Sequence, residues 1–222
     1  MPEYLFVETY SYSPGETLSP FLDNARQVLE NLGYAGKDVE TWLSRVAWEP
    51  DGSGFGLSLE PSARLERVMV NSHALFAKPI VSGWTQQSIP QRQEAWVCLT
   101  LAFETQTEKQ NLDTVNSFNT NYAQDHRYQP GVGKAMWSVM RQCAALFPQA
   151  LVYFTDEGQE GESWEALLTS QSGIWEFDMA LIHHSLAGHF ASNSEQFAHI
   201  HLPEGVGFAR TARWNTLPWE EE

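Results

Sequence analysis

The chain has 222 residues, 28 of them acidic and 13 basic, so its formal net charge is −15 at pH 7. A field of this sign repels phosphate groups, which argues against nucleic acid and against an anionic membrane surface as ligands. It attracts a macromolecule with a basic surface instead. Because 42% of the residues are hydrophobic and no linker or change of composition divides the chain, we expect a single domain over residues 1–222.

The first residues and the two cysteines indicate the compartment. The opening MPEYLFVETY has an acid at position 3 and lacks the basic stretch that begins a secretory signal. No apolar run has the length of a membrane span. Cys98 and Cys143 lie in apolar runs, which predicts two buried thiols in place of a disulfide framework. These features predict a cytoplasmic protein.

The N-terminal part predicts a strand followed by a helix. Residues 4–10 are rich in aromatic and β-branched side chains, which are typical of a strand. From Phe21 to Leu32 the apolar residues fall on one helical face. We expect Ser19 to cap this helix at its N-terminus and Gly33 to end it.

Three further elements are expected before the middle of the chain. Residues 38–48 predict a second short helix, and the alternation in residues 55–59 predicts a strand. Residues 62–78 are ambiguous. The stretch 95–103 (AWVCLTLAF) is apolar on both alternating faces, which is typical of a central strand covered on both sides. Helices must therefore cover at least one face of the sheet.

The last third of the chain predicts a long helix and three strands. Residues 132–147 carry a continuous apolar stripe at helical spacing, and residues 150–154 predict a strand. Residues 197–202 and 208–214 predict antiparallel strands joined by a five-residue loop, 203–207. The predicted fold class is therefore α+β, with a mixed or antiparallel sheet and helices packed on it.

One histidine pair is a candidate metal site. His199 and His201 lie two residues apart on a predicted strand, so their side chains share one face. Such a pair is typical of metal ligands, but no third ligand stands at a recognisable spacing, and HExxH and CxxC are absent. The pattern favours two surface histidines. With no nucleophile motif such as GxSxG either, we expect a protein without catalytic activity and without a cofactor.

A cluster of acids near residue 160 is the candidate binding site. The ten-residue window from position 156 to 165 contains five acids, no base and one tryptophan. Charge runs are often only solvated loops, but an aromatic residue among the acids favours a docking surface, because aromatic residues are enriched at interfaces. The predicted partner-binding residues are Asp156, Glu157, Glu160, Glu162, Trp164 and Glu165.

Two tryptophans are candidates for exposed recognition residues. Trp137 lies off the apolar stripe of its predicted helix, and Trp219 stands between Pro218 and the acidic C-terminus. The tail from about 217 to 222 is expected to be frayed.

The size of the chain and the order of its segments resemble those of the immunity protein 52 family. The resemblance extends from YLFVETY through AWVCLTLAF to GKAMWSVMRQCAALFPQALVYF. It implies an antitoxin that neutralises a type VI secretion nuclease effector by binding it. Basic nuclease surfaces fit an acidic inhibitor that occludes the active site or the substrate surface. The alternatives are a metal-dependent hydrolase using His199 and His201, and an acidic adaptor or chaperone for a basic client.

Overall fold

The structure is a computed structural model. It describes residues 4–14, 17–48, 54–58, 66–70, 73–85, 94–104, 127–128, 131–147, 150–156, 177–188 and 195–220.

A nine-stranded antiparallel sheet forms the centre of this described part. Eight strands follow one another in the order β2-β4-β5-β1-β6-β7-β9-β8, and β3 pairs with β4. In chain order the strands are β1 (Tyr4–Pro14), β2 (Gly54–Ser58), β3 (Glu66–Val70), β4 (His73–Thr85), β5 (Glu94–Glu104), β6 (Leu151–Asp156), β7 (Met179–Ile182), β8 (Phe197–Leu202) and β9 (Gly205–Arg210). The predicted α+β class is confirmed, and the sheet is of the antiparallel kind.

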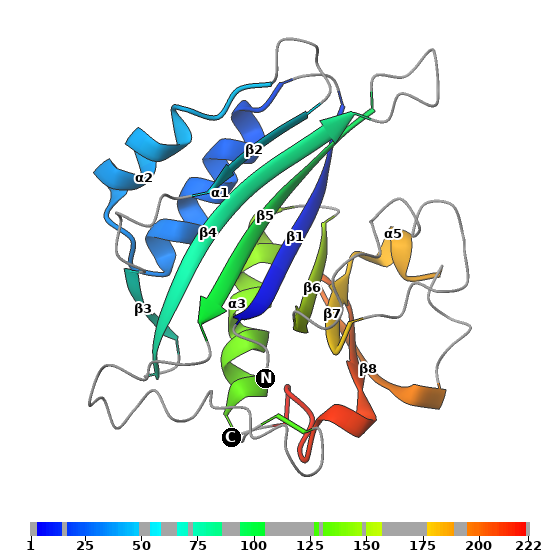
Figure 1. Cartoon of the computed structure of the whole chain (residues 1–222). Coiled ribbons are helices and arrows are strands. Elements are labelled where there is room, and N and C mark those ends of the chain that lie inside the picture. Colours follow the sequence, from blue (N-terminus) through cyan, green and yellow to red (C-terminus); the bar gives the residue numbers. More distant parts are fainter. Residues whose placement is uncertain are drawn as a thin grey trace.

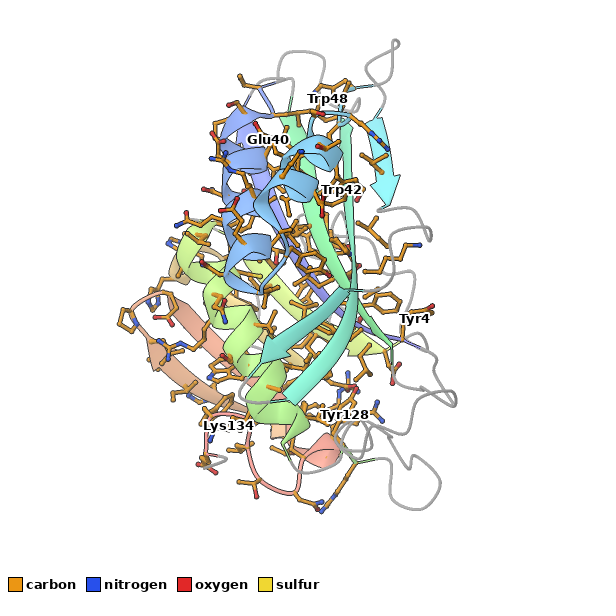
Figure 2. The ribbon with its side chains drawn as sticks, turned by 90° about the vertical axis from the view of Figure 1, so that its left-hand side faces the viewer. Tyr4, Glu40, Trp42, Trp48, Tyr128 and Lys134 are labelled. Carbon is orange, nitrogen blue, oxygen red and sulfur yellow. The ribbon has the colours of Figure 1, made fainter. Side chains whose placement is uncertain are left out.

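Helices cover one face of this sheet, as predicted. Figure 1 shows two of the three longer ones behind β4, β5 and β1 and the third, residues 36–43, to the left of β4, and the side view in Figure 2 shows the helices on one side of the sheet. They are α1 (Ser19–Asn31), α2 (Gly36–Leu43) and α3 (Val132–Leu146). A single turn, α5 (His184–Ala187), and a 3-10 turn, η4 (Thr211–Arg213), follow later in the chain. None of the helices within the described ranges is long and apolar enough to cross a membrane.

The predicted boundaries of the first two helices needed correction. Leu18, not Ser19, is the N-cap of α1, and no side chain caps the helix. Pro20 fixes a helical φ within the first turn, so the helix can begin without a capping hydroxyl. Gly33 ends the helix as predicted, with φ at +100°, a conformation that favours glycine. The second helix, α2, ends at Leu43 and not near residue 48.

The core lies mainly between the sheet and the helices. On β1, Leu5 and Val7 are fully buried on the helix side. Every residue of β5 from Val97 to Phe103 is buried, so the prediction of a strand covered on both faces is confirmed. Cys98 and Cys143 are buried free thiols, also as predicted. A second apolar cluster occupies the opposite face of the β6, β7, β9 and β8 region, and contains Leu151, Tyr153, Phe177, Ala180, Ile182, Phe197, Val206 and Phe208.

The C-terminal hairpin is tighter than predicted. The strands β8 and β9 pair from Leu202 and Gly205 onward, so only two residues connect them. Two glycines assigned to the loop instead belong to β9. A Cβ at Gly205 would overlap a backbone carbonyl of β7, and a Cβ at Gly207 would overlap the indole of Trp137. These glycines therefore permit close packing and do not form the turn.

The expectation of exposure is wrong for Trp137, whereas Trp219 is partly buried. Trp137 is 7% exposed, and Trp219 packs against its ring with centroids 5.4 Å apart. Leu217 and Trp219 both contact the main core. The tail is thus folded through Glu220, because the packing of Trp219 on the buried Trp137 removes apolar area from water.

Candidate functional site

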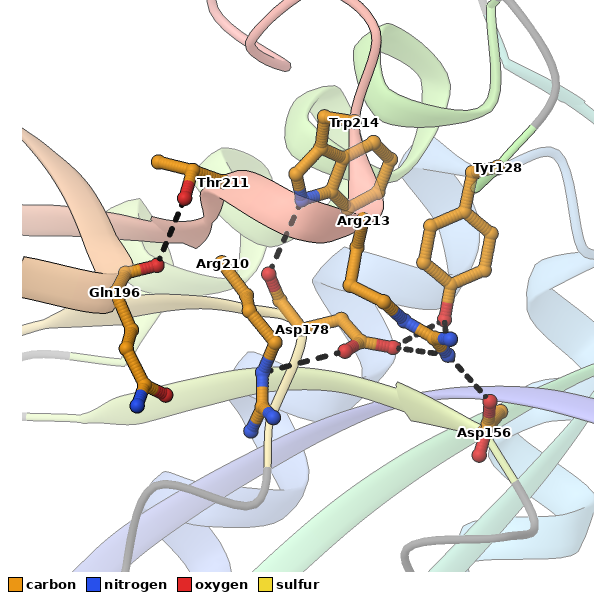
Figure 3. A network of polar contacts seen from close by, with 8 residues as sticks. All are labelled: Tyr128, Asp156, Asp178, Gln196, Arg210, Thr211, Arg213 and Trp214. Atoms are coloured by element: carbon orange, nitrogen blue, oxygen red, sulfur yellow. Dashed lines mark hydrogen bonds and ion pairs between the residues drawn. The ribbon is translucent and has the colours of Figure 1, made fainter. Parts of the chain in front are cut away.

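A buried polar network lies where β6 ends, β7 begins and β9 ends (Figure 3). Its centre is Asp178, whose side chain is fully buried. Tyr128 Oη donates a hydrogen bond to its Oδ2 at 2.5 Å, and Arg213 Nη2 donates to the same oxygen at 2.9 Å. Arg210 Nε lies 3.7 Å from Oδ1. A buried carboxylate requires such partners, because an uncompensated charge is costly away from water.

Arg213 also binds a second carboxylate. Its Nη2 donates to Asp156 Oδ2 at 2.8 Å, and the side chains of Arg213 and Asp156 are only 14% and 8% exposed. The guanidinium carbon lies 5.1 Å from the centre of the Tyr128 ring, within the range of a cation–π contact. One cation therefore holds two carboxylates and an aromatic ring.

The strand register brings these residues together. Phe154 on β6 pairs with Met179 on β7, and Met179 pairs with Ala209 on β9. The neighbours of these residues in sequence, Asp156, Asp178 and Arg210, thus meet at one end of the sheet. The 3-10 turn after β9 then returns Arg213 over them (Figure 3). Sequence analysis did not link Asp178 and Tyr128 to Arg213. Asp178 lies 35 residues and Tyr128 lies 85 residues from Arg213 in the sequence, and such separations leave no local pattern.

The network borders two long stretches outside the described residues. Asp156 and Asp178 stand on either side of residues 157–176, which contain five acids and no base. Tyr128 follows residues 105–126, which contain three acids and one base. Glu104 pairs with Tyr4 and Asp156 with Leu5, so both stretches begin at the same end of the sheet, on either side of β1.

The charge of the protein is unevenly divided between the described residues and the rest. The described residues contain 13 acids and 10 bases, for a net charge of −3. The remaining residues contain 15 acids and 3 bases, for a net charge of −12. Of these 15 acids, 12 lie between the described ranges, and Glu3, Glu221 and Glu222 lie at the two ends of the sequence.

The predicted binding residues have different outcomes. Asp156 is not a loop carboxylate. It is the last residue of β6, only 6% exposed and paired with Arg213, so it serves the network and is not displayed to a partner. Glu157, Glu160, Glu162, Trp164 and Glu165 lie outside the described residues, and their role in binding stays a prediction.

His199 and His201 project from one face of β8, as predicted. Both are exposed, and their ring centroids are 5.8 Å apart. His184 lies near the same hairpin, but its Nε2 is engaged at 2.9 Å with the main-chain oxygen of Leu202. In the described part of the chain, no group of three or more histidine, cysteine or carboxylate side chains is arranged to hold a metal ion.

The buried thiols and tyrosines lack the electrostatics of catalytic groups. Burial raises the pKa of Cys143 to about 11, and burial together with the charge of Glu8 raises the pKa of Cys98 well above its ordinary value. Burial likewise raises the pKa of Tyr10, whose hydroxyl donates to Glu8 at 3.1 Å. A nucleophilic cysteine needs a lowered pKa, so neither thiol is suited to nucleophilic catalysis.

Comparison with known proteins assigns no function to this network, so its role is argued from its own chemistry. No family model, curated protein or solved structure matches this chain. The features available for a functional argument are therefore the buried Arg213 network, the acidity of the connecting segments and the overall charge.

Proposed function

We propose that this protein is an immunity protein, which neutralises a nuclease toxin by binding to the toxin's basic surface. The observation that carries the proposal is the division of charge, since the stretches between the described ranges contain 12 acids and 3 bases, a net charge of −9, and the described residues have a net charge of only −3. Connecting segments on a rigid scaffold commonly carry recognition. The resemblance of the segment order to the immunity protein 52 family points to the same class of partner.

The Arg213 network contributes rigidity to this arrangement. It joins the residues before and after the most acidic stretch, Asp156 and Asp178, through one guanidinium. Holding both ends of a binding segment lowers the conformational entropy lost on association. A nuclease exposes cationic groups where it holds DNA, so an acidic partner associates rapidly with that surface and occludes it.

The test begins with the neighbouring gene, which should encode the toxin if the proposal holds. We expect the purified pair to form a complex whose association rate falls as salt rises, while its dissociation rate changes less. Coexpression should protect a host cell from the toxin. An association rate that does not change with salt would contradict the electrostatic mechanism.

Charge reversal in two places locates the surface. The first variant replaces Glu157, Glu160, Glu162 and Glu165 by lysine. The control variant makes the same change in net charge on α1 and α2, at four exposed acids, Asp23, Glu30, Asp38 and Glu40. Like charges across an interface cost several kcal/mol, so we expect the first variant to bind at least about a hundredfold more weakly. The control should lose less than about tenfold, and equal losses would place the surface elsewhere.

A further inference from the structure

Two exposed histidines on the last strand of the described sheet have no part in the immunity function proposed above. The strand β8 ends the strand order, and it carries His199 and His201 two residues apart (Figure 1). The residues that alternate with them, Ile200 and Leu202, pack against the main core. Because successive side chains of a strand point to opposite faces, both imidazoles project together from the face opposite the helices, and both are exposed.

The hairpin holds both histidines on a fixed base. Across it, His199 pairs with Phe208 and His201 pairs with Val206, and both of these partners are buried. Residues two apart on a strand have Cα atoms separated by about 6.6 Å, at about 3.3 Å per residue. A base that already holds two ligands side by side lowers the conformational entropy lost when both bind one ion.

Both imidazoles are available as ligands. Within the described ranges, neither ring takes part in a hydrogen bond or an ion pair, and their one ring contact is with each other. By contrast, His183 and His184 each use a ring nitrogen, the first toward Ser185 and the second toward the main-chain oxygen of Leu202. A neutral imidazole with a nitrogen lone pair to offer is the commonest metal ligand in proteins.

The distance between the rings fits one shared ion. A metal ion about 2.0–2.1 Å from a histidine nitrogen lies about 3.2 Å from the centre of that ring. Two rings that bind one ion at an angle of about 90–110° therefore have centres about 4.5–5.2 Å apart. The ring centroids of His199 and His201 are 5.8 Å apart. Rotation about the side-chain bonds of two exposed residues closes this difference of about 1 Å.

We propose that His199 and His201 together chelate a divalent transition metal ion, with Cu²⁺ bound most tightly. Imidazole donors suit Cu²⁺, Ni²⁺ and Zn²⁺, and of these Cu²⁺ has the highest affinity for nitrogen sites. The net charge of −15 attracts cations to the protein. In the part of the chain that the structure describes, no third histidine, cysteine or carboxylate joins the pair, so the other coordination positions are open to water or to a group of another molecule. This metal site goes beyond the proposed immunity function and does not depend on the toxin.

The probe is Cu²⁺ alone, titrated by calorimetry into the untagged full chain at about pH 7. We expect one saturable site, weakened at least about tenfold in His199→Ala and equally in His201→Ala, because each change removes the gain from a second ligand held nearby. Electron paramagnetic resonance of the bound Cu²⁺ should show two nitrogen ligands in the wild type and one in each variant. The matched control replaces His183 and His184 by alanine, since it removes two histidines whose ring nitrogens are already engaged. The control should bind as the wild type does, and circular dichroism checks that each variant is folded.

Three results would overturn the proposal. The first is no saturable binding of Cu²⁺ to the folded wild type. The second is binding by both single variants within about threefold of the wild type, which would mean that the two rings do not share one ion. The third is an equal loss of affinity in the control variant. Since the toxin is absent from this experiment, its outcome is separate from that of the immunity function.

Discussion

Replacing Arg213 by alanine removes the cation that two buried carboxylates share. Asp156 loses an ion pair of 2.8 Å, and Asp178 loses one of 2.9 Å. Asp178 keeps the hydrogen bond from Tyr128 and the nearby Arg210. Removing one partner of a buried ion pair typically costs about 3–5 kcal/mol, and the lost cation–π contact with Tyr128 adds about 1 kcal/mol. We expect a loss of about 4–6 kcal/mol in the free energy of unfolding.

Urea denaturation and thermal melting measure this loss. For a chain of this length, 1 kcal/mol corresponds to about 2–4 °C, so the melting temperature should fall by about 8–24 °C. Arg141→Ala is the control, because its ion pair with Glu204 is half exposed on the arginine side and should contribute at most about 1 kcal/mol.

A double-mutant cycle tests the physical reason. Asp156→Asn should cost less in the background of Arg213→Ala than in the wild type, because the cation that it pairs with is already gone. The coupling should be about 1–3 kcal/mol. If Arg213→Ala unfolds within about 1 kcal/mol of the wild type, the network does not hold this end of the sheet and the reasoning is refuted.

Three further predictions concern single side chains. The buried hydroxyl of Tyr153 has no hydrogen-bond partner among the described residues, so Tyr153→Phe should be neutral or should stabilise the protein by up to about 1 kcal/mol. The control Tyr34→Phe loses a 2.6 Å hydrogen bond to a main-chain carbonyl, so it should destabilise the protein by about 1 kcal/mol. Urea titrations measure both changes. Burial raises the pKa of Cys143 to about 11, whereas the thiol of an unfolded chain has a pKa of about 8.5. The protonated Cys143 thiol therefore contributes fully to the stability of the folded protein below a pH of about 8.5, and this contribution is lost as the pH rises to about 11. Over this pH range the free energy of unfolding should fall by on the order of 3 kcal/mol more for the wild type than for Cys143→Ala. Parallel curves of stability against pH for the two proteins would contradict this prediction. Gly207→Ala should destabilise by about 1–3 kcal/mol through overpacking, whereas Gly56→Ala, with open space around the added methyl, should show a melting temperature close to that of the wild type.

The sequence predicted those features that depend on local periodicity. The apolar stripe of residues 132–147 gave the correct position of α3, and the continuous apolar run of residues 95–103 correctly indicated a strand buried on both faces. The strand β4 was missed, because its first residues fall in the ambiguous range 62–78. Its partners β5, β2 and β3 decide that it is a strand, and they lie elsewhere in the sequence.

The candidate site was predicted less well, because its residues are distant in sequence. Asp156 belongs by composition to an acidic run, but the register of β6 against β1 and β7 places it in the interior, where Arg213 neutralises it. A carboxylate looks the same in sequence whether it is solvated or paired. Only the tertiary structure supplies the partner.

Composition and local pattern therefore determined the net charge, the α+β class and the burial of both thiols, since each depends on residue type or on neighbours within a few positions. Tertiary structure decided the fate of particular glycines, tryptophans and acids. Gly207 lies in a strand and Trp137 is buried because α3 crosses the hairpin, and Asp178 is a paired interior charge because three strands end beside it. These outcomes depend on contacts between segments that are remote in sequence, and such contacts are fixed by the packing of the whole sheet.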